Sequence, residues 1–214
     1  LISIIFFFRS GQKKGLGNLY RCRSLAIELN KYKNINIIIS TTHKKLFDIG
    51  FKGFDFSWMP IDRIMKSKDN DIIIVDISNC PINLQNRLKS RCKFLVGIDD
   101  WGTGPFVYDF FLRPNPIKLP QPKMMEKACN IYKGKDHILL NPKFAKLKIR
   151  KFNRNVKNVF VCFGGSDPRG YTIRVMRILL KENFTKKIKF TVVIGPYFLS
   201  VNKLNNMLSK RKNF

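Results

Sequence analysis

Acidic residues are scarce in this sequence. Its 214 residues include 14 Asp and Glu against 41 Lys and Arg, which gives a formal net charge of +27. A field of that sign would suit a nucleic acid or an anionic membrane surface. The lysines are scattered, however, and abundant Ile, Asn and Phe accompany them, a composition typical of AT-rich coding sequence. The basic residues of a nucleic-acid-binding protein should gather on one face. We therefore expect no specific nucleic-acid partner, and peripheral contact with an anionic membrane is the partner that the charge still allows.

Cysteine and histidine are also few. The five cysteines lie far apart with no C-x-x-C pair, and the two histidines are isolated. This pattern excludes the usual zinc motifs, and scattered thiols in apolar surroundings indicate reduced cysteines in a cytoplasmic protein. We therefore expect neither a metal nor an organic cofactor.

Hydrophobic runs of membrane-spanning length are missing. The opening segment 1–8 (LISIIFFF) is too short to cross a bilayer, and neither a basic stretch nor a small-residue cleavage site flanks it. A buried parallel strand is the better interpretation. The chain also begins without Met, and we expect it to be a fragment at both ends.

Short apolar runs alternate instead with segments of helical spacing. One such stripe consists of Leu19, Cys22, Leu25, Ala26 and Leu29. The strands that this alternation predicts are 2–8, 35–40, 72–77, 93–98, 157–163 and 189–194. Strand–helix–strand alternation predicts an α/β protein with parallel sheets.

The middle of the chain differs from both ends. Residues 113–122 hold four prolines, which excludes a helix interior or a central strand. A basic stretch follows over 133–157, and a new strand–turn–helix unit then begins. We predict a Rossmann-like domain with a basic linker over 1–153. A second, incomplete Rossmann-like domain follows over 154–214, with two strands and a Lys-rich helix at 201–212.

A glycine turn lies between the first strand and the first helix. Gly15 and Gly17 permit close approach of a ligand to the backbone, and helix N-termini favour anions. Asn18 is expected at the N-cap. Arg21 opposes the helix dipole, which indicates a compensating carboxylate or acidic ligand. The alternative is that the glycines only form the turn and Asn18 only caps the helix. An NAD site is disfavoured, because no acidic residue ends the second predicted strand to bind a ribose.

A second glycine loop, Gly164-Gly165-Ser166-Asp167-Pro168, follows the strand at 157–163. Its backbone N–H groups could cradle a pyrophosphate. Alternatively, Ser166 or Asp167 caps an ordinary helix in which Pro168 takes the first position.

Aspartates end two of the predicted strands. Asp99 and Asp100 follow one, and Asp76 lies in the other, at the edge where open α/β sheets bind ligands. They could hold sugar hydroxyls or act as a base. Asp99 and Asp100 could instead cap the segment Trp101–Gly104 through Asx turns.

Four ordered motifs carry a family resemblance. Residues 15–22 (GLGNLYRC), 74–76 (IVD), 97–100 (GIDD) and 163–168 (FGGSDP) resemble those of the UDP-sugar hydrolase of pseudaminic acid biosynthesis and of spore-coat polysaccharide proteins. The resemblance implies the GT-B arrangement of two Rossmann domains. It also implies hydrolysis of a UDP-linked diacetamido-trideoxy sugar, with UDP released.

The resemblance assigns candidate roles residue by residue. The family places a catalytic His at position 18; Asn18 lacks its basicity and could only orient water or a hydroxyl. The candidate catalytic residues are Asn18, Asp99 and Asp100. The candidate substrate-binding residues are Gly15, Gly17, Arg21, Asp76, Gly164, Gly165, Ser166 and Asp167. The alternatives are a GT-B glycosyltransferase using a UDP-sugar donor, a basic nucleic-acid-binding module and a non-catalytic fragment.

Overall fold

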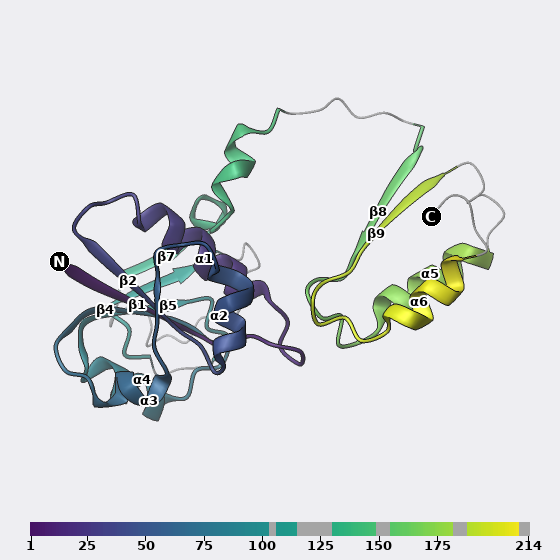
Figure 1. Cartoon of the computed structure of the whole chain (residues 1–214). Helices are drawn as coiled ribbons and strands as arrows, with labels where there is room; N and C mark the ends of the chain where they lie inside the picture. Colours follow the sequence, from purple (N-terminus) through teal and green to yellow (C-terminus); the bar gives the residue numbers. More distant parts are fainter. Residues whose placement is uncertain (103–105, 115–129, 149–154, 182–187, 210–214) are drawn as a thin grey trace. The chain divides into compact units, whose positions relative to one another are not determined.

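A computed structural model describes residues 1–102, 106–114, 130–148, 155–181 and 188–209 (Figure 1). The chain divides into two compact units. The first contains Leu1–Arg9 and Asn18–Lys146, and the second contains Ser10–Gly17 and Leu147–Phe214. Cys129 and most of the proline-rich segment 113–122 lie outside the described residues.

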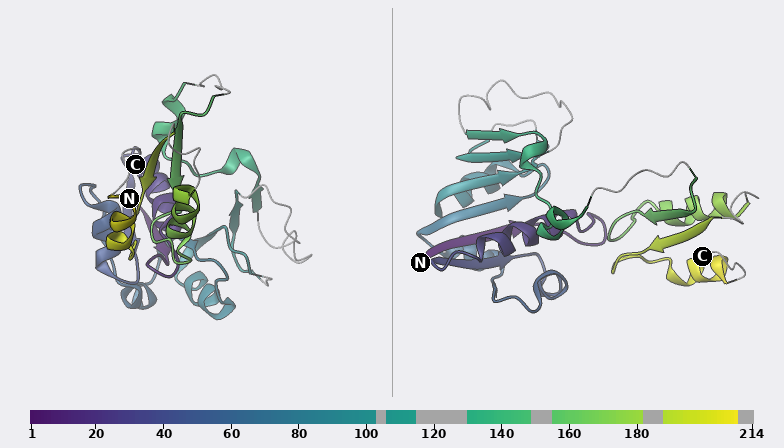
Figure 2. Two further views of the ribbon diagram at one scale, coloured as in Figure 1. Left: turned by 90° about the vertical axis from the view of Figure 1, so that its right-hand side faces the viewer. Right: turned by 90° about the horizontal axis from the view of Figure 1, so that it is seen from above.

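The first unit is built on a seven-stranded sheet in which every neighbouring pair is parallel. The strand order is β3-β2-β1-β4-β5-β6-β7, so the chain reverses its direction across the sheet between β1 and β4. Figure 2 shows the strands side by side. The strands are β1 (Ile2–Phe8), β2 (Ile35–Ser40), β3 (Ser57–Trp58), β4 (Asn70–Asp76), β5 (Cys92–Ile98), β6 (Phe110–Arg113) and β7 (Asn130–Lys133).

Helices cover both faces of this sheet. Phe8 of β1 lies 6.0 Å from Phe51 of α2, ring centre to ring centre. Residues alternating with it along β1, such as Phe7, share a buried cluster with Ile64 of α3 and Leu88 of α4. The helices are α1 (Gly17–Leu29), α2 (Lys44–Phe51), α3 (Ile61–Lys66) and α4 (Ile82–Lys89), followed by the 3-10 helices η2 (Lys135–His137) and η3 (Pro142–Lys146). The predicted α/β class with a parallel, Rossmann-like sheet is confirmed.

The centre of the core is the opening strand. Residues 4–8 of β1 are each at most 3% exposed. Central parallel strands are buried on both faces and therefore lack the apolar–polar alternation of half-exposed strands. Residues 2–8 thus form a strand whose last five residues lie in the core, as the sequence predicts.

In its described residues, the second unit contains one parallel pair of strands and two helices. β8 (Asn158–Cys162) pairs with β9 (Lys189–Val193), and α5 (Tyr171–Lys181) and α6 (Val201–Leu208) accompany them. Its core consists of Val161, Ile173, Met176, Phe190, Phe198 and Leu204. The predicted helix at 201–212 is present over 201–208, and residues 210–212 lie outside the described part of the chain.

The described residues include no helix that combines the length and the apolar character needed to cross a membrane.

Candidate functional site

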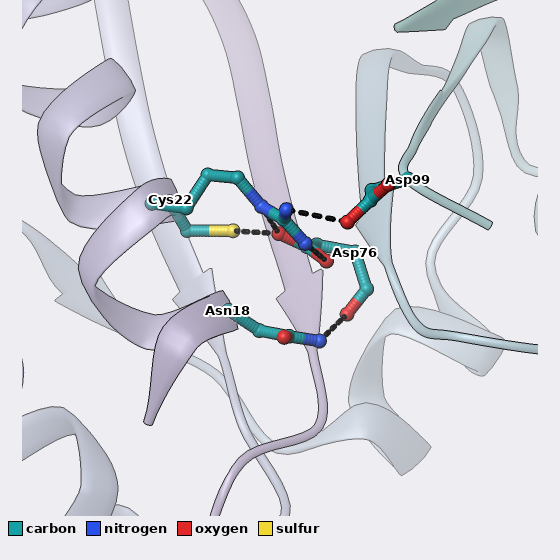
Figure 3. Close-up of polar contacts among 5 residues, drawn as sticks. Asn18, Cys22, Asp76 and Asp99 are labelled. Carbon is teal, nitrogen blue, oxygen red and sulfur yellow. Dashed lines mark hydrogen bonds and ion pairs between the residues drawn. The ribbon is translucent and has the colours of Figure 1, made fainter. Parts of the chain in front are cut away.

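A cluster of polar side chains lies where β4 and β5 end and α1 begins (Figure 3). Its members are Asn18 and Arg21 from α1, Asp76 at the end of β4, and Asp99 just after β5. This is the edge of an open parallel sheet beside its reversal point, the place where such sheets commonly bind ligands. The tertiary structure brings together four of the predicted site residues that are up to 81 positions apart in sequence.

Arg21 holds this cluster together. Its Nε and Nη2 donate to the two oxygens of Asp76, each at 2.7 Å, and its Nη1 donates to Oδ2 of Asp99 at 2.7 Å. Bidentate pairing of this kind is both strong and directional. Arg21 lies in the first turns of α1, where the helix dipole disfavours a cation, and the two carboxylates supply the compensation that the sequence predicts.

Asp76 is fully buried at the centre of these contacts. Burial raises the pKa of its carboxyl, and the Arg21 guanidinium offsets part of that rise. For Arg21, burial alone would lower the pKa, but its pairs with Asp76 and Asp99 outweigh burial and raise it. Cys22 donates its thiol to Asp76 Oδ2 at 3.7 Å. The carboxylate of Asp76 is therefore occupied by protein groups, and its role here is to anchor Arg21.

Asn18 makes a different contact from the one predicted. Helix α1 begins at Gly17, so Asn18 lies within the helix and is not its N-cap. Its side-chain amide donates to the backbone carbonyl of Asp76 at 2.9 Å. The N-cap prediction was wrong, since the helix already starts at Gly17 and the Asn18 amide donates to the backbone carbonyl at the end of β4.

Asp99 is the more accessible of the two carboxylates that Arg21 contacts. Its side chain is 16% exposed, and among the residues that the structure describes only its Oδ2 is bonded to another side chain. Its backbone adopts the left-handed conformation, with φ of 51°. Non-glycine residues rarely adopt that conformation outside turns and functional sites. Asp99 thus presents a fixed carboxylate with one oxygen left for a ligand.

Asp100 has structural partners for both oxygens. It accepts the hydroxyl of Tyr108 at 2.8 Å and the backbone N–H groups of Cys80 at 3.2 Å and Gly102 at 2.9 Å. Burial, with Asp100 beside it, raises the pKa of Tyr108. The bond to Gly102 is the Asx turn that the sequence offered as the alternative to catalysis; Thr103 and Gly104 lie outside the described residues. Asp100 therefore joins three segments around the end of β5.

In the first glycine turn, conformation distinguishes the two predicted residues. Gly15 has φ of 78° and forms an antiparallel bridge with Gly11, through bonds of 2.8 and 2.9 Å. Gly17 opens α1 without a positive φ, so its conformation does not require glycine. Sequence reasoning missed Gly11, which lies four residues before Gly15 and also has a positive φ.

The second glycine loop lies within the second unit. Gly164 has φ of 79°, and Asp167 accepts the N–H groups of Tyr171 at 2.9 Å and Thr172 at 2.7 Å. Asp167 therefore binds the free N–H groups at the start of α5. The prediction that Pro168 takes the first helical position was wrong, because α5 begins at Tyr171. Ser166 is 4% exposed, and its hydroxyl has no partner among the described residues.

A close backbone contact fixes this loop against the end of β9. Tyr197 donates its N–H to the carbonyl of Gly165 at 3.1 Å. A Cβ placed on Gly195 would come within 2.4 Å of the Cα and carbonyl oxygen of Gly165. Only a glycine at position 195 allows the two loops to approach this closely.

We expect Gly195→Ala to destabilise the second unit by about 2 kcal/mol or more, because the added methyl meets backbone that cannot move aside. Hydrogen exchange of the β8 and β9 amides should accelerate accordingly. Gly17→Ala is the matched control: nothing lies within 4 Å of its Cβ position, and no loss is expected. Equal exchange in the two variants would contradict the close contact.

No group of three or more His, Cys, Asp or Glu side chains within the described residues is arranged to hold a metal ion. The cysteines at 22, 80, 92 and 162 are free thiols.

The fold and this cluster together define an open parallel α/β protein with a polar site at its reversal point. No protein-family model matches the chain. It is 30% identical over 213 residues to the uncharacterized protein MJ1062 of Methanocaldococcus jannaschii, a match covering 92% of this chain and 43% of that protein. It is 24% identical over 178 residues to the spore coat polysaccharide biosynthesis protein SpsG of Bacillus subtilis, covering 79% of this chain and 52% of that protein. The chain thus spans about half the length of these relatives.

Proposed function

We propose that the protein processes a sugar nucleotide in polysaccharide biosynthesis. The observation that carries this proposal is the polar cluster of Asn18, Arg21 and Asp99 at the reversal point of the sheet, in a chain similar to a spore coat polysaccharide biosynthesis protein. Ligands of open α/β sheets bind at this edge. A carboxylate oxygen and a side-chain amide there are suitable partners for the hydroxyls of a sugar.

Within this function, Arg21 is a positioning residue and not a ligand of the substrate. Three of its nitrogens are bonded to Asp76 and Asp99, whereas Asp99 keeps one oxygen free of other side chains in the described part of the chain. Arg21 thereby fixes the direction in which Asp99 presents that oxygen. The substrate-facing groups of the cluster are then Asn18 and Asp99.

We further propose that the reaction is hydrolysis of a UDP-linked amino-deoxy sugar. Water attacks the anomeric carbon, the bond from that carbon to the phosphate oxygen breaks, and UDP leaves with the electron pair. The proton of the water passes to a base. Asn18 cannot accept it, so the free oxygen of Asp99 is the acceptor that the cluster offers. The family motifs described above support this finer assignment.

We propose separately that the second glycine loop, within the second unit, binds a phosphate group. Gly164 has a positive φ that a tight turn requires, and the buried Ser166 hydroxyl has no partner in the described residues. Successive N–H groups in such a turn bind phosphate oxygens. Asp167 takes no part, because its carboxylate is committed to α5.

A thermal-shift titration of the full-length protein with UDP tests the proposal. Saturation at about one hundred times the dissociation constant should add about 2.7 kcal/mol to the free energy of unfolding, seen as a higher Tm. ADP is the matched control, and Ser166→Ala should weaken the response to UDP. An unchanged Tm with UDP, or an equal response to ADP, would reject the nucleotide assignment.

Asn18 and Asp99 also favour a second candidate, a glycosyltransferase. With no basic group at position 18, the cluster could equally activate an acceptor hydroxyl through Asp99 instead of water. The products distinguish the two: a transferase yields a glycosylated acceptor, and a hydrolase yields the free sugar.

A further inference from the structure

The segment from Asn130 to Lys146 exposes four large apolar side chains. It contains β7, the edge strand of the seven-stranded sheet, and the 3-10 helices η2 and η3, drawn in green after β7 in Figure 1. Neither 3-10 helix has a buried residue. The exposed apolar residues of the segment are Tyr132, Ile138, Leu140 and Phe144, and Leu140 and Phe144 are 61% and 57% exposed.

Lysines alternate with these apolar residues. Lys133, Lys135, Lys143 and Lys146 are all exposed, and Asp136 is the only acidic residue of the segment. None of the ion pairs found in the described residues involves these four lysines. The segment therefore combines exposed apolar groups with a local excess of positive charge.

We propose that residues 130–146 form a membrane-contact surface that binds anionic lipid. At a membrane interface, apolar side chains enter the boundary between headgroups and acyl chains while neighbouring cations meet anionic headgroups. The aliphatic Ile138 and Leu140 gain from this environment, and the long lysine side chains can reach the headgroups beside them.

Charge and side-chain chemistry favour a membrane over other occupants. A second copy of the chain would bring two molecules of net charge +27 together, and this repulsion opposes association. Single-stranded RNA binds by stacking bases on aromatic and guanidinium planes. Here the most exposed apolar residue is Leu140, and the described segment contains no arginine.

Vesicle co-sedimentation tests the proposal on the whole chain. We expect binding to vesicles of phosphatidylserine and phosphatidylcholine, weakening as salt rises, and little binding to phosphatidylcholine alone. Lys143→Gln with Lys146→Gln should lower the partition coefficient by about 30-fold, from the usual contribution of a lysine near an anionic surface. Leu140→Ser with Phe144→Ser should lower it several-fold.

Two matched variants separate this surface from the general charge and hydrophobicity of the chain. Lys44→Gln with Lys45→Gln removes the same charge from exposed positions of α2, and Ile178→Ser with Leu199→Ser removes exposed apolar groups elsewhere. Both should bind nearly as the wild type does. Losses equal to those of the test variants would overturn the proposal. Indifference to lipid charge, or binding of single-stranded RNA in preference to anionic vesicles, would also overturn it.

A fluorescence measurement places the segment directly. Phe144→Trp should give an emission that shifts to the blue with anionic vesicles and is quenched by brominated lipid, after the wild-type signal of Trp58 and Trp101 is subtracted. Emission unchanged by anionic vesicles would place residue 144 in water and reject the proposed contact.

Discussion

Replacing Asn18 with His is expected to raise the rate of sugar-nucleotide hydrolysis by about 10² to 10⁴, the usual contribution of a positioned general base. The structure explains why an imidazole should be oriented correctly there. The Asn18 amide donates to the carbonyl of Asp76 at 2.9 Å, and Nδ1 of a histidine occupies nearly the same place on its side chain. A bond from Nδ1–H to that carbonyl would fix the tautomer and leave Nε2 as the proton acceptor.

The rate should be measured as UDP released by the full-length protein, with Asn18→Ala as the matched control. The alanine variant removes the amide without adding a base, so it should not gain activity. Asp99→Asn tests whether Asp99 or the introduced histidine acts as the base. In the native protein this change should abolish any activity. In the Asn18→His protein the same change should leave part of the activity, because the histidine remains. Native hydrolysis that the histidine variant cannot improve would refute this interpretation of position 18.

Replacing Arg21 with Met should lower the free energy of unfolding of the first unit by about 3 to 5 kcal/mol, because it leaves the buried carboxylate of Asp76 unpaired. Urea denaturation followed by circular dichroism measures the loss. Lys93→Met is the matched control. It removes one partner of an exposed ion pair with Asp71, so a much smaller loss is expected. Equal losses would show that the Arg21 pairs do not stabilise the fold.

The loss should also depend on pH in a defined direction. Burial already raises the pKa of Asp76, and removal of Arg21 raises it further. A carboxyl whose folded pKa exceeds its unfolded value of about 3.9 favours the folded state least at high pH. The free energy of unfolding that Arg21→Met loses relative to the wild type should therefore be smallest near pH 4. The loss should grow as the pH rises through the pKa of Asp76 in the folded protein. Adding Asp76→Asn should remove most of this pH dependence.

All six strands predicted from the sequence are present, including those buried on both faces. The segments 2–8 and 35–40 coincide with β1 and β2, and the segment 72–77 overlaps β4, since continuous runs of branched and aromatic residues indicate such strands directly. β3, β6 and β7 were missed. They are two to four residues long and lie toward the two edges of the sheet, where pairing with a neighbour defines a strand more than composition does.

The candidate site, too, could be predicted from the sequence only in part. The position of Arg21 in the first turns of a helix was enough to predict an acidic partner, either a carboxylate or a ligand, because a cation there opposes the helix dipole. The sequence around Arg21 does not show which carboxylates pair with it. Asp76 and Asp99 lie 55 and 78 residues further along the chain, and their distances from Arg21 depend on β4 and β5 pairing in register beside β1.

The sequence by itself determined the α/β class, the buried parallel strands and the need for an acidic partner of Arg21, since each of these follows from periodicity or charge within a few residues. Only the tertiary structure decided which role each of the acidic residues has. Asp76 anchors Arg21, Asp99 keeps one oxygen without a side-chain partner in the described residues, and Asp100 binds Tyr108 and two backbone N–H groups. The physical reason is that a carboxylate acquires its role from the donors that reach it, and strand pairing and helix packing bring those donors from distant parts of the chain.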